Sequence, residues 1–489
     1  MKTSLRFLAP AFVALLALPI AARAALPWQD FAYSYTAADK KKIPVPGQSA
    51  KLVVPEDPAQ PAAAKVELFL LRLTATTKTP GAPIVYLHGG PGGSALEHLE
   101  SPDFRALFDA LRAEADVILL DQRGCGKSTP SLVPTGVPRI GPDSLVSRAS
   151  FLEYLKQSSV LVRDRTVKAG HDPRHFTTLD SIEDLEALRV ALGAEKINLL
   201  AHSYGTQLAQ AFVRAHPASV GRLVLIGSRG MDTARKLPGE PDAFLPRIAE
   251  LAKADATVGA KFPDLMSTLT RVLAKADHAP IDVPIEDEKK KITTYRVGGY
   301  ALRFIVAKFY LNDPDNTRFL PKLLDEIDTG RRPWSLTFNV LQLLRSPVSL
   351  AWFTVDAATG ATPVRAELIR AQAATALLGD AMNFPFPDIN DVWRVPDHGD
   401  AFRAPVKSDV PTLFVAGTLD GITPVAQTRE IMRGFTQARL LVVENAGHNS
   451  QLRPPAVAAG IAGFFAHRTP PETATLPLFA FRPLVAAEN

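Results

Sequence analysis

Short runs of consecutive apolar residues punctuate this chain and predict the strands of a buried sheet. A strand covered on both faces shows such an unbroken run, whereas a strand with one wet face alternates polar and apolar positions. The unbroken runs fall at residues 83–87, 117–120, 196–201, 223–226, 411–416 and 439–443. Residues 65–74 instead alternate, and we expect an edge strand there. The pattern predicts an α/β protein with a mostly parallel central sheet.

The run at residues 196–201 lies between two helical patterns. Upstream, apolar residues at three- and four-residue spacing predict a helix that Asp180 or Ser181 caps and Gly193 ends. Downstream, residues 207–215 contain no helix breaker. This is a strand, helix, strand unit of a parallel sheet, and such units cover both faces of the sheet with helices.

The turn after that strand has the sequence Ala-His-Ser-Tyr-Gly over residues 201–205. A serine with small residues two before and two after it, between a strand and a helix, is the pattern of a nucleophile elbow. Ala201 differs from the usual glycine by one methyl group, and Gly205 matches the pattern. Ser203 is therefore the candidate nucleophile, provided that a base, an orienting acid and an oxyanion hole accompany it.

An acid and a base follow two later strands. Asp420 comes just after the strand at 411–416, and His448 just after the strand at 439–443. The order serine, acid, histidine is that of α/β-hydrolases, in which His448 would take the Ser203 proton and Asp420 would orient the imidazole. His202 should point away from the serine. It and three other histidines are expected to have packing or surface roles: His98, His171 and His398.

The strand at 83–87 is followed by a glycine-rich loop with the sequence His-Gly-Gly-Pro-Gly-Gly-Ser, residues 88–94. Glycines allow backbone N–H groups to face a developing negative charge. We predict an oxyanion hole formed by the N–H groups of Gly90 and Tyr204. Nucleotide binding is the alternative, but the spacing matches neither GxxxxGK[ST] nor GxGxxG.

The glycine-rich loop, together with Asp-Gln-Arg-Gly-Cys-Gly-Lys-Ser at residues 121–128, resembles the proline iminopeptidase branch of serine peptidases. Residues 175–206 and 414–424 resemble the secreted tripeptidyl-aminopeptidase-like members of that family. The resemblance is strong at residues 81–130, 175–230 and 405–465 and faint between 231 and 404. It implies an α/β-hydrolase that removes N-terminal residues from peptides.

Two features depart from this family. Its secreted members often carry cysteine pairs, whereas Cys125 is the single cysteine of the chain, so no intramolecular disulfide can form and we expect an inert thiol. Ala201-His202 before the serine replaces the family's two glycines and is also familiar in esterases. The resemblance implies an aminopeptidase that releases N-terminal proline or short N-terminal peptides, and a carboxylesterase acting on small esters is the alternative. A catalytically idle binding protein would lack part of the triad or hole, and no part is missing.

The motif positions divide the chain into a hydrolase core and an inserted cap. We predict core segments at 25–229 and 405–489 and a mainly helical cap at 230–404. Within the cap, residues 302–309 and 323–330 predict helices, and the charged run at 285–291 predicts a solvated hairpin tip. The family resemblance implies carboxylates near the cap that hold a substrate amine. Three candidates are considered but not assigned, because each is expected to be a surface residue or a helix cap: Glu240, Asp242 and Asp356.

Residues 1–24 predict an export signal. Two basic residues precede an apolar run over residues 7–20 that ends at Ala22-Arg23-Ala24, an AxA cleavage pattern. The run is short for a membrane span, so we expect a secreted or periplasmic protein without a stable membrane anchor.

Loss of residues 1–24 removes three of 55 basic residues and no acid, which leaves 52 basic against 50 acidic residues. That balance gives no reason to expect nucleic-acid binding. No cofactor or metal is expected, and the oligomeric state cannot be read from the sequence.

Overall fold

The computed structural model describes residues 26–36, 42–345 and 349–484. In these residues one ten-stranded sheet has the strand order β1-β2-β3-β5-β4-β6-β7-β10-β11-β12. The pairs from β5 to β12 are parallel, and those among β1, β2, β3 and β5 are antiparallel. The bounds are β1 Gln29–Thr36, β2 Lys42–Pro55, β3 Lys65–Leu73, β4 Ile84–Leu87, β5 Val117–Leu120, β6 Ile197–His202, β7 Val220–Ile226, β10 Thr412–Gly417, β11 Ala438–Glu444 and β12 Thr473–Thr475.

The six unbroken apolar runs form strands β4, β5, β6, β7, β10 and β11, within a few residues of the predicted limits. The prediction of an edge strand at 65–74 is wrong. β3 lies between β2 and β5, with Leu68 opposite Leu52 and Leu71 opposite Leu119. The alternation of apolar and polar residues shows which face of a strand is exposed to solvent. It does not show whether other strands pair with its two edges. β1 and β2, in the proline-containing lead-in, supply the neighbours that the pattern did not reveal.

Helices cover both faces of the sheet, as expected. On one face α1 (Pro102–Arg112) and α16 (Pro455–Phe465) pack together on a cluster that includes Leu119, Leu200 and Val415. On the other, α3 (Thr178–Ala191), α4 (Tyr204–Ala215) and α15 (Val425–Met432) lie against alternate residues of the same strands. The unbroken apolar runs are explained by this double coverage.

The start of α3 corrects a prediction. Its N-cap is Thr177, and Asp180 acts from the third helical position, where it accepts hydrogen bonds from the Thr177 amide (3.2 Å) and hydroxyl (2.6 Å). This reciprocal capping box makes Asp180 a partner of the cap and places Ser181 inside the helix. The helix ends before Gly193, whose φ of 64° suits a glycine after a helix.

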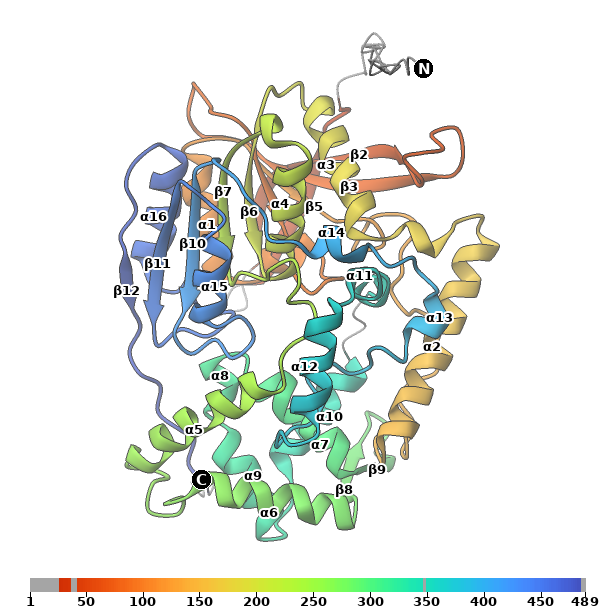
Figure 1. The fold of residues 1–489 in the computed structure, drawn as a ribbon, viewed down its shortest axis with the longest axis vertical. Coiled ribbons are helices and arrows are strands. Elements are labelled where there is room, and N and C mark those ends of the chain that lie inside the picture. Colours follow the sequence, from red (N-terminus) through yellow and green to blue (C-terminus); the bar gives the residue numbers. More distant parts are fainter. Residues whose placement is uncertain (1–25, 37–41, 346–348, 485–489) are drawn as a thin grey trace, which may run out of the picture.

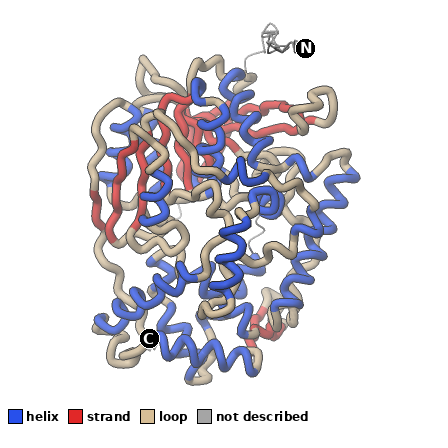
Figure 2. Tube along the Cα trace, viewed as in Figure 1, coloured by secondary structure: helices blue, strands red, loops and turns tan. Residues whose placement is uncertain are grey.

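Between β7 and β10 the chain forms a layer of helices below the sheet (Figure 1). Figure 2 shows this layer as mainly helical, with one short hairpin. Its elements are α5 Gly239–Ala254, α6 Leu265–His278, β8 Ile281–Glu286, β9 Ile292–Val297, α7 Gly299–Ile305, a π-helical turn Val306–Tyr310, α8 Pro314–Thr317, α9 Leu320–Asp328, α10 Trp334–Arg345, α11 Ala351–Thr359, α12 Pro363–Ala373, α13 Asn390–Trp393 and α14 Gly399–Arg403. Before the layer lie α2 Arg148–Lys168 and short 3-10 turns at Ala95–Leu99, Pro173–His175 and Pro217–Ser219.

The two predicted helices of this insertion and its hairpin are present. Residues 302–309 lie in α7 and the π-helical turn, residues 323–328 lie in α9, and residues 287–291 join β8 to β9. Most of the insertion has its own apolar core, which α2 shares through Phe151 and Leu155. Its helices α11, α13 and α14 instead pack in the core cluster of the sheet. The limits at 229 and 404 stay predictions. Residues 1–24 lie outside the described part, in which no helix is long and apolar enough to cross a membrane.

Candidate active site

Ser203 occupies the sharp turn between β6 and α4. Its φ of 55° and ψ of −123° are values that a residue other than glycine rarely adopts. Its amide donates to the carbonyl of Ile226 on β7 (2.9 Å). A Cβ atom at Gly205 would lie 2.2 Å from the Leu87 carbonyl oxygen, so only glycine fits there. Ala201 is fully buried, so its extra methyl group is accommodated. The strand, turn and helix have the geometry of a nucleophile elbow.

Asp420 and His448 form a buried acid–base pair at the carboxyl ends of β10 and β11. His448 Nδ1 lies 2.8 Å from Asp420 Oδ2, and the exposed fractions of the two residues are 6% and 1%. The Asp420 carboxylate also accepts the amide hydrogens of Ile422 and Thr423 at 2.8 Å each. Burial alone would raise the Asp420 pKa, but the charge and hydrogen bond of His448 and those of Thr423 outweigh it and lower this pKa to about 2. Asp420 is therefore an anion that can stabilise an imidazolium at His448.

The structure brings Ser203 and His448 against the same stretch of backbone at the end of β7. The Ser203 amide is bonded to Ile226, and a Cβ on the next residue, Gly227, would lie 3.0 Å from His448 Cε1. The missing side chain at Gly227 thus gives the imidazole its place beside the elbow. Among the described residues the Ser203 hydroxyl has no hydrogen-bond partner. Catalytic hydrogen bonds are often long without substrate and shorten when it binds.

The glycine-rich loop lies directly against Ser203. A Cβ at Gly89 would lie 2.6 Å from Ser203 Cβ, and Gly90 has a φ of 111° that only glycine adopts without strain. In the described part of the chain the N–H groups of Gly90 and Tyr204 have no hydrogen-bond partner. These are the two donors predicted for the oxyanion hole, and the loop therefore leaves them available to a developing negative charge.

Asp121 and Gln122 hold this loop in place, and sequence reasoning did not assign them this role. The Asp121 carboxylate accepts hydrogen bonds from the Ser94 hydroxyl (2.7 Å) and from the amides of Ala95 and Lys127 (2.8 Å each). The Gln122 side chain donates to the His88 carbonyl at 2.9 Å. Residues 121–128 indicate a family resemblance, and the polar pair directly after β5 is the sequence feature that marks this role.

The other histidines form packing contacts. His202 points away from Ser203, with Nε2 3.1 Å from the His448 carbonyl oxygen, and its ring lies 5.5 Å from that of His98. Burial lowers the pKa of His202 to about 3 and that of His88 to about 4, so both rings are neutral at pH 7. His171 is paired with Glu56 and His398 packs on Phe402, far along the chain from the elbow.

The three carboxylates considered for amine binding differ in what they already bind. Asp356 is buried, which corrects the expectation of a surface or capping residue, and it pairs with Arg229 and with the indole N–H of Trp352 (2.8 Å). Asp242 and Glu240 lie in the first turn of α5, and Asp242 accepts the Leu377 amide at 3.2 Å. The Asp356 carboxylate is thus occupied by cations of the protein itself.

Cys125 is buried, and burial raises the pKa of its thiol, as expected for an inert cysteine. Among the described residues there is no group of three His, Cys, Asp or Glu side chains that could hold a metal ion.

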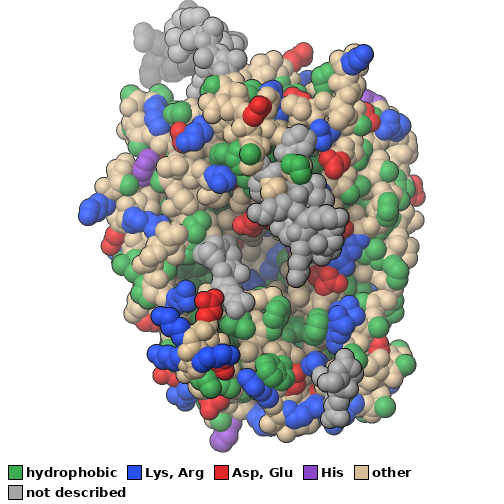
Figure 3. Space-filling model, turned by 180° about the vertical axis from the view of Figure 1, so that it is seen from behind, with side chains coloured by type: hydrophobic (Ala, Val, Ile, Leu, Met, Phe, Trp, Pro, Cys, Tyr) green, Lys and Arg blue, Asp and Glu red, His purple; other side chains and the backbone are tan. Residues whose placement is uncertain are grey.

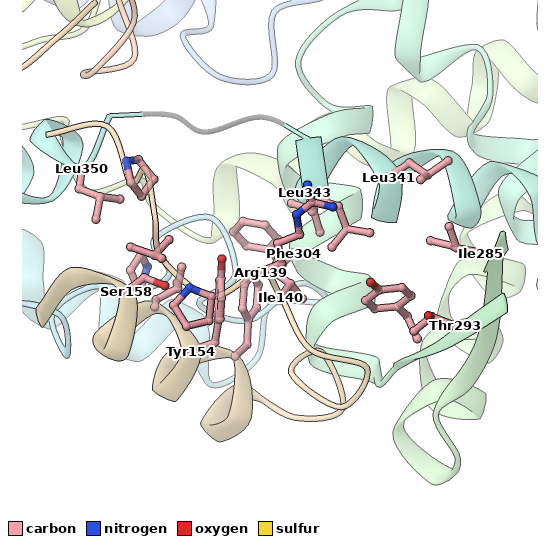
Figure 4. A pocket seen from close by; sticks show the side chains of 18 of the residues that line it. Arg139, Ile140, Tyr154, Ser158, Ile285, Thr293, Phe304, Leu341, Leu343 and Leu350 are labelled. Carbon is pink, nitrogen blue, oxygen red and sulfur yellow. The ribbon is translucent and has the colours of Figure 1, made fainter. Parts of the chain in front are cut away.

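A cavity of 1180 Å³ lies between α2, the β8–β9 hairpin, α10 and α11 (Figure 4). Its walls are mainly apolar and include Tyr154, Phe304 and Trp352. Ser349 lines it as well, and a Cβ at Gly92 would lie 2.6 Å from the Ser349 carbonyl oxygen. The cavity therefore adjoins the glycine-rich loop beside Ser203.

A serine in an elbow, a His–Asp pair beside it and a glycine-rich loop define the class of serine hydrolases. Residues 82–455 match the family described as "alpha/beta hydrolase fold". The chain belongs to this family and is a serine hydrolase of that fold, as its motifs indicated.

Among curated proteins, this chain is 29% identical over 218 residues to a tripeptidyl aminopeptidase of Streptomyces coelicolor, a match that covers 42% of this chain and 38% of that protein. It is 28% identical over 270 residues to the serine protease Hip1 of Mycobacterium tuberculosis, covering 52% of each. It is 31% identical over 202 residues to a probable proline iminopeptidase of Streptomyces coelicolor, covering 41% of this chain and 50% of that protein. The matches thus span about half of these relatives or less.

Solved structures similar to this chain include a proline iminopeptidase of Mycobacterium smegmatis, with 17% identity and a TM-score of 0.39, which covers 86% of this chain and 98% of that one. A thermophilic esterase of Thermogutta terrifontis has 18% identity and a TM-score of 0.36, and covers 85% and 98%.

Proposed function

We propose that this protein is an exported serine aminopeptidase that releases proline or short peptides from peptide N-termini. The observation that carries the hydrolytic part is the placement of Ser203 beside the His448–Asp420 pair, with two free backbone donors across from it. The peptidase part is supported by the printed names of the curated relatives.

In the proposed reaction Ser203 attacks the carbonyl carbon of the substrate while His448 takes the hydroxyl proton. The tetrahedral oxyanion accepts hydrogen bonds from the N–H groups of Gly90 and Tyr204. His448 then returns the proton to the leaving amine, which leaves an acyl-enzyme on Ser203. Water attacks this ester with His448 again as the base, and Asp420 stabilises the imidazolium in both steps.

A carboxylesterase with the same residues is the second candidate, and one observation favours it. An ammonium that leaves water needs a carboxylate partner, and Asp356, the most buried of the three candidates, is already paired with Arg229 and Trp352. An ester without an amine would need no such partner.

The deciding experiment compares initial rates of the purified protein and of Ser203→Ala on three sets of substrates. These are fluorogenic Pro-, Ala- and tripeptidyl-amides with a free amine, the same amides after N-acetylation, and short acyl esters. The proposal predicts serine-dependent cleavage of the free-amine amides that acetylation abolishes. Cleavage of esters alone would instead establish the esterase.

Export is a separate part of the proposal and is supported by the signal pattern at residues 1–24. Expression of the full chain in a bacterium, fractionation and N-terminal sequencing test it. A mature chain that begins at Ala25 outside the cytoplasm is expected. A cytoplasmic protein that keeps Met1 or Lys2 would contradict it.

A further inference from the structure

Five cationic side chains gather in the insertion beside the elbow, and no step of the proposed reaction uses them. The electrostatic interactions of two half-buried lysines and of Arg235 join the five into one group, here called the cation cluster: Arg229, Arg235, Lys236, Lys308 and Arg365. Figure 3 shows a hollow across the middle of the back face, with Lys and Arg side chains visible inside it.

The cluster is attached to the catalytic turn through Arg229. The Arg229 amide donates to Thr206 Oγ1 at 2.8 Å, and the Thr206 hydroxyl donates to the Ser203 carbonyl at 2.6 Å. The Arg229 guanidinium lies 5.4 Å from the centre of the Tyr204 ring. The Asp420 carboxylate is also near enough to act on the charge of Lys236. The Arg229 backbone is therefore tied to the catalytic turn, and Lys236 lies within electrostatic range of Asp420.

The lysines are fixed by the loop between α12 and α13. The Lys236 amide donates to the Asn383 side chain at 2.7 Å and the Asn383 amide group donates back to the Lys236 carbonyl at 2.8 Å. Lys308 Nζ donates to the Met382 carbonyl at 2.8 Å and lies 5.5 Å from the ring centre of Trp352, which lines the cavity. This loop thus holds the Lys236 backbone and the Lys308 ammonium, and Lys308 lies behind the cavity wall at Trp352.

The cluster has too few carboxylates for its charge. Asp356 pairs with Arg229 and Arg235, and Glu240 acts on Lys236. Asp420 also acts on the charge of Lys236, whereas Asp397 binds Arg403 outside the cluster. Five cations therefore face three carboxylates: Asp356, Glu240 and Asp420.

Three donors of the cluster are buried and, in the described part of the chain, have no hydrogen-bond partner: Arg229 Nε, Lys236 Nζ and Arg365 Nη2. Arg229 as a whole is only 6% exposed. Burial lowers the pKa of both Lys236 and Lys308 to about 8, so each is still mainly charged at pH 7. The Arg229 guanidinium is paired with Asp356, but the Lys236 ammonium has no bonded partner among the described residues. An unpaired buried charge is costly, and an arriving anion would remove that cost.

We propose that the cation cluster binds a carboxylate of the substrate, so that this hydrolase prefers acidic substrates in which a carboxylate lies close to the scissile bond. The inference rests on the proposed function in one respect: the ligand of the cluster is taken to be the substrate that Ser203 attacks. Guanidinium and ammonium donors together suit a carboxylate, and hydrogen bonds to charged groups are the stronger ones. The carboxylate can be an Asp or Glu side chain or the C-terminus of a short peptide, since both present the same two oxygens.

Binding to the Ser203→Ala protein, measured by calorimetry, tests this without any cleavage. The probes are two isosteric pairs: N-acetylglutamate α-amide against N-acetylglutamine α-amide for a side chain, and N-acetylalanine against N-acetylalaninamide for a C-terminus. We expect at least one carboxylate to bind about tenfold or more tighter than its amide. Equal binding within both pairs, or binding of no carboxylate, overturns the proposal. Whichever pair discriminates identifies the source of the carboxylate.

Variants locate the binding in the cluster. Lys236→Met in the Ser203→Ala background should lose about tenfold in carboxylate affinity, and Lys236→Arg should regain most of it. Lys253→Met, which removes an exposed lysine of α5, is the matched control and should change nothing. Carboxylate affinity unchanged in Lys236→Met would contradict the assignment. The binding measurements do not depend on substrate cleavage. Their outcome is therefore independent of the substrate panel that tests the proposed function.

Discussion

Asp420→Asn replaces one carboxylate oxygen of the proposed site by an amide nitrogen. The side chain keeps its size and loses its negative charge, so the variant tests the role of that charge. Asp420 Oδ2 accepts the hydrogen of His448 Nδ1 at 2.8 Å, and Oδ1 accepts two backbone amide hydrogens at 2.8 Å each. The two amides select the oxygen of an asparagine, so the amide nitrogen would face Nδ1. His448 would then have to present a lone pair at Nδ1 and carry its proton at Nε2, which leaves no base for Ser203.

The expected loss in kcat is about four orders of magnitude, as for other triads with the wrong tautomer. The same substitution removes a stabilising charge, because the Asp420 pKa is lowered from 3.8 to about 2 in the folded protein. A difference of that size corresponds to about 2 kcal/mol of folding free energy. Since the folded pKa is the lower one, this stabilisation is present above pH 4 and is lost as the pH falls from about 4 to about 2.

Two assays check this prediction. Steady-state rates on the best substrate of the panel measure kcat, and urea unfolding at pH 7 and at pH 3 measures stability. Asp409→Asn, at an exposed carboxylate just before β10, is the control and should leave both unchanged. A kcat within tenfold of the wild type would refute the assigned role of Asp420. A stability difference between wild type and Asp420→Asn that is the same at both pH values would refute the linkage argument.

Three further predictions concern the surroundings of the site. Gly205→Ala should lower kcat about a hundredfold, because its Cβ would lie 2.2 Å from the Leu87 carbonyl and shift the elbow; rates and circular dichroism measure this. Arg123→Met should cost about 3–5 kcal/mol in urea unfolding, since it leaves the buried Asp184 carboxylate, 2.7 Å from the guanidinium, without a partner. Cys125 should resist a thiol reagent at pH 8 in the folded protein and react at once in urea, because burial raises its pKa.

Each of these has a control or a contradicting outcome. Arg174→Met removes an exposed ion pair with Asp172 and should cost less than about 1 kcal/mol, so equal losses in the two arginine variants would refute the burial argument. Full activity in Gly205→Ala would show that the elbow can move. Rapid labelling of Cys125 in the folded protein would show that its surroundings open.

The sequence predicted the parts of this protein whose structure is decided locally. An unbroken apolar run needs only a sheet covered on both faces, and each of the six runs became a strand. Ser203, Asp420 and His448 could be proposed as a triad because each comes shortly after a strand, and the carboxyl ends of parallel strands meet at one edge.

The parts that depend on distant partners could not be predicted. β3 lies inside the sheet because β2 covers its edge, and β2 comes from a stretch that shows no clear apolar pattern. The buried pairing of Asp356 with Arg229 joins residues 127 positions apart, and the charge of either residue alone fits a surface position as well. The same holds for Lys236, whose backbone is bonded to the side chain of Asn383, 147 positions further along the chain.

The measurement that tests the central claim most directly is covalent labelling with a fluorophosphonate, read by intact mass and peptide mapping. Such a reagent reacts with a serine that a neighbouring base activates. The account predicts one label per chain, attached to Ser203, a matching loss of hydrolytic activity, and no label in Ser203→Ala. Labelling at another residue, or a Ser203→Ala protein that keeps its activity, would contradict it.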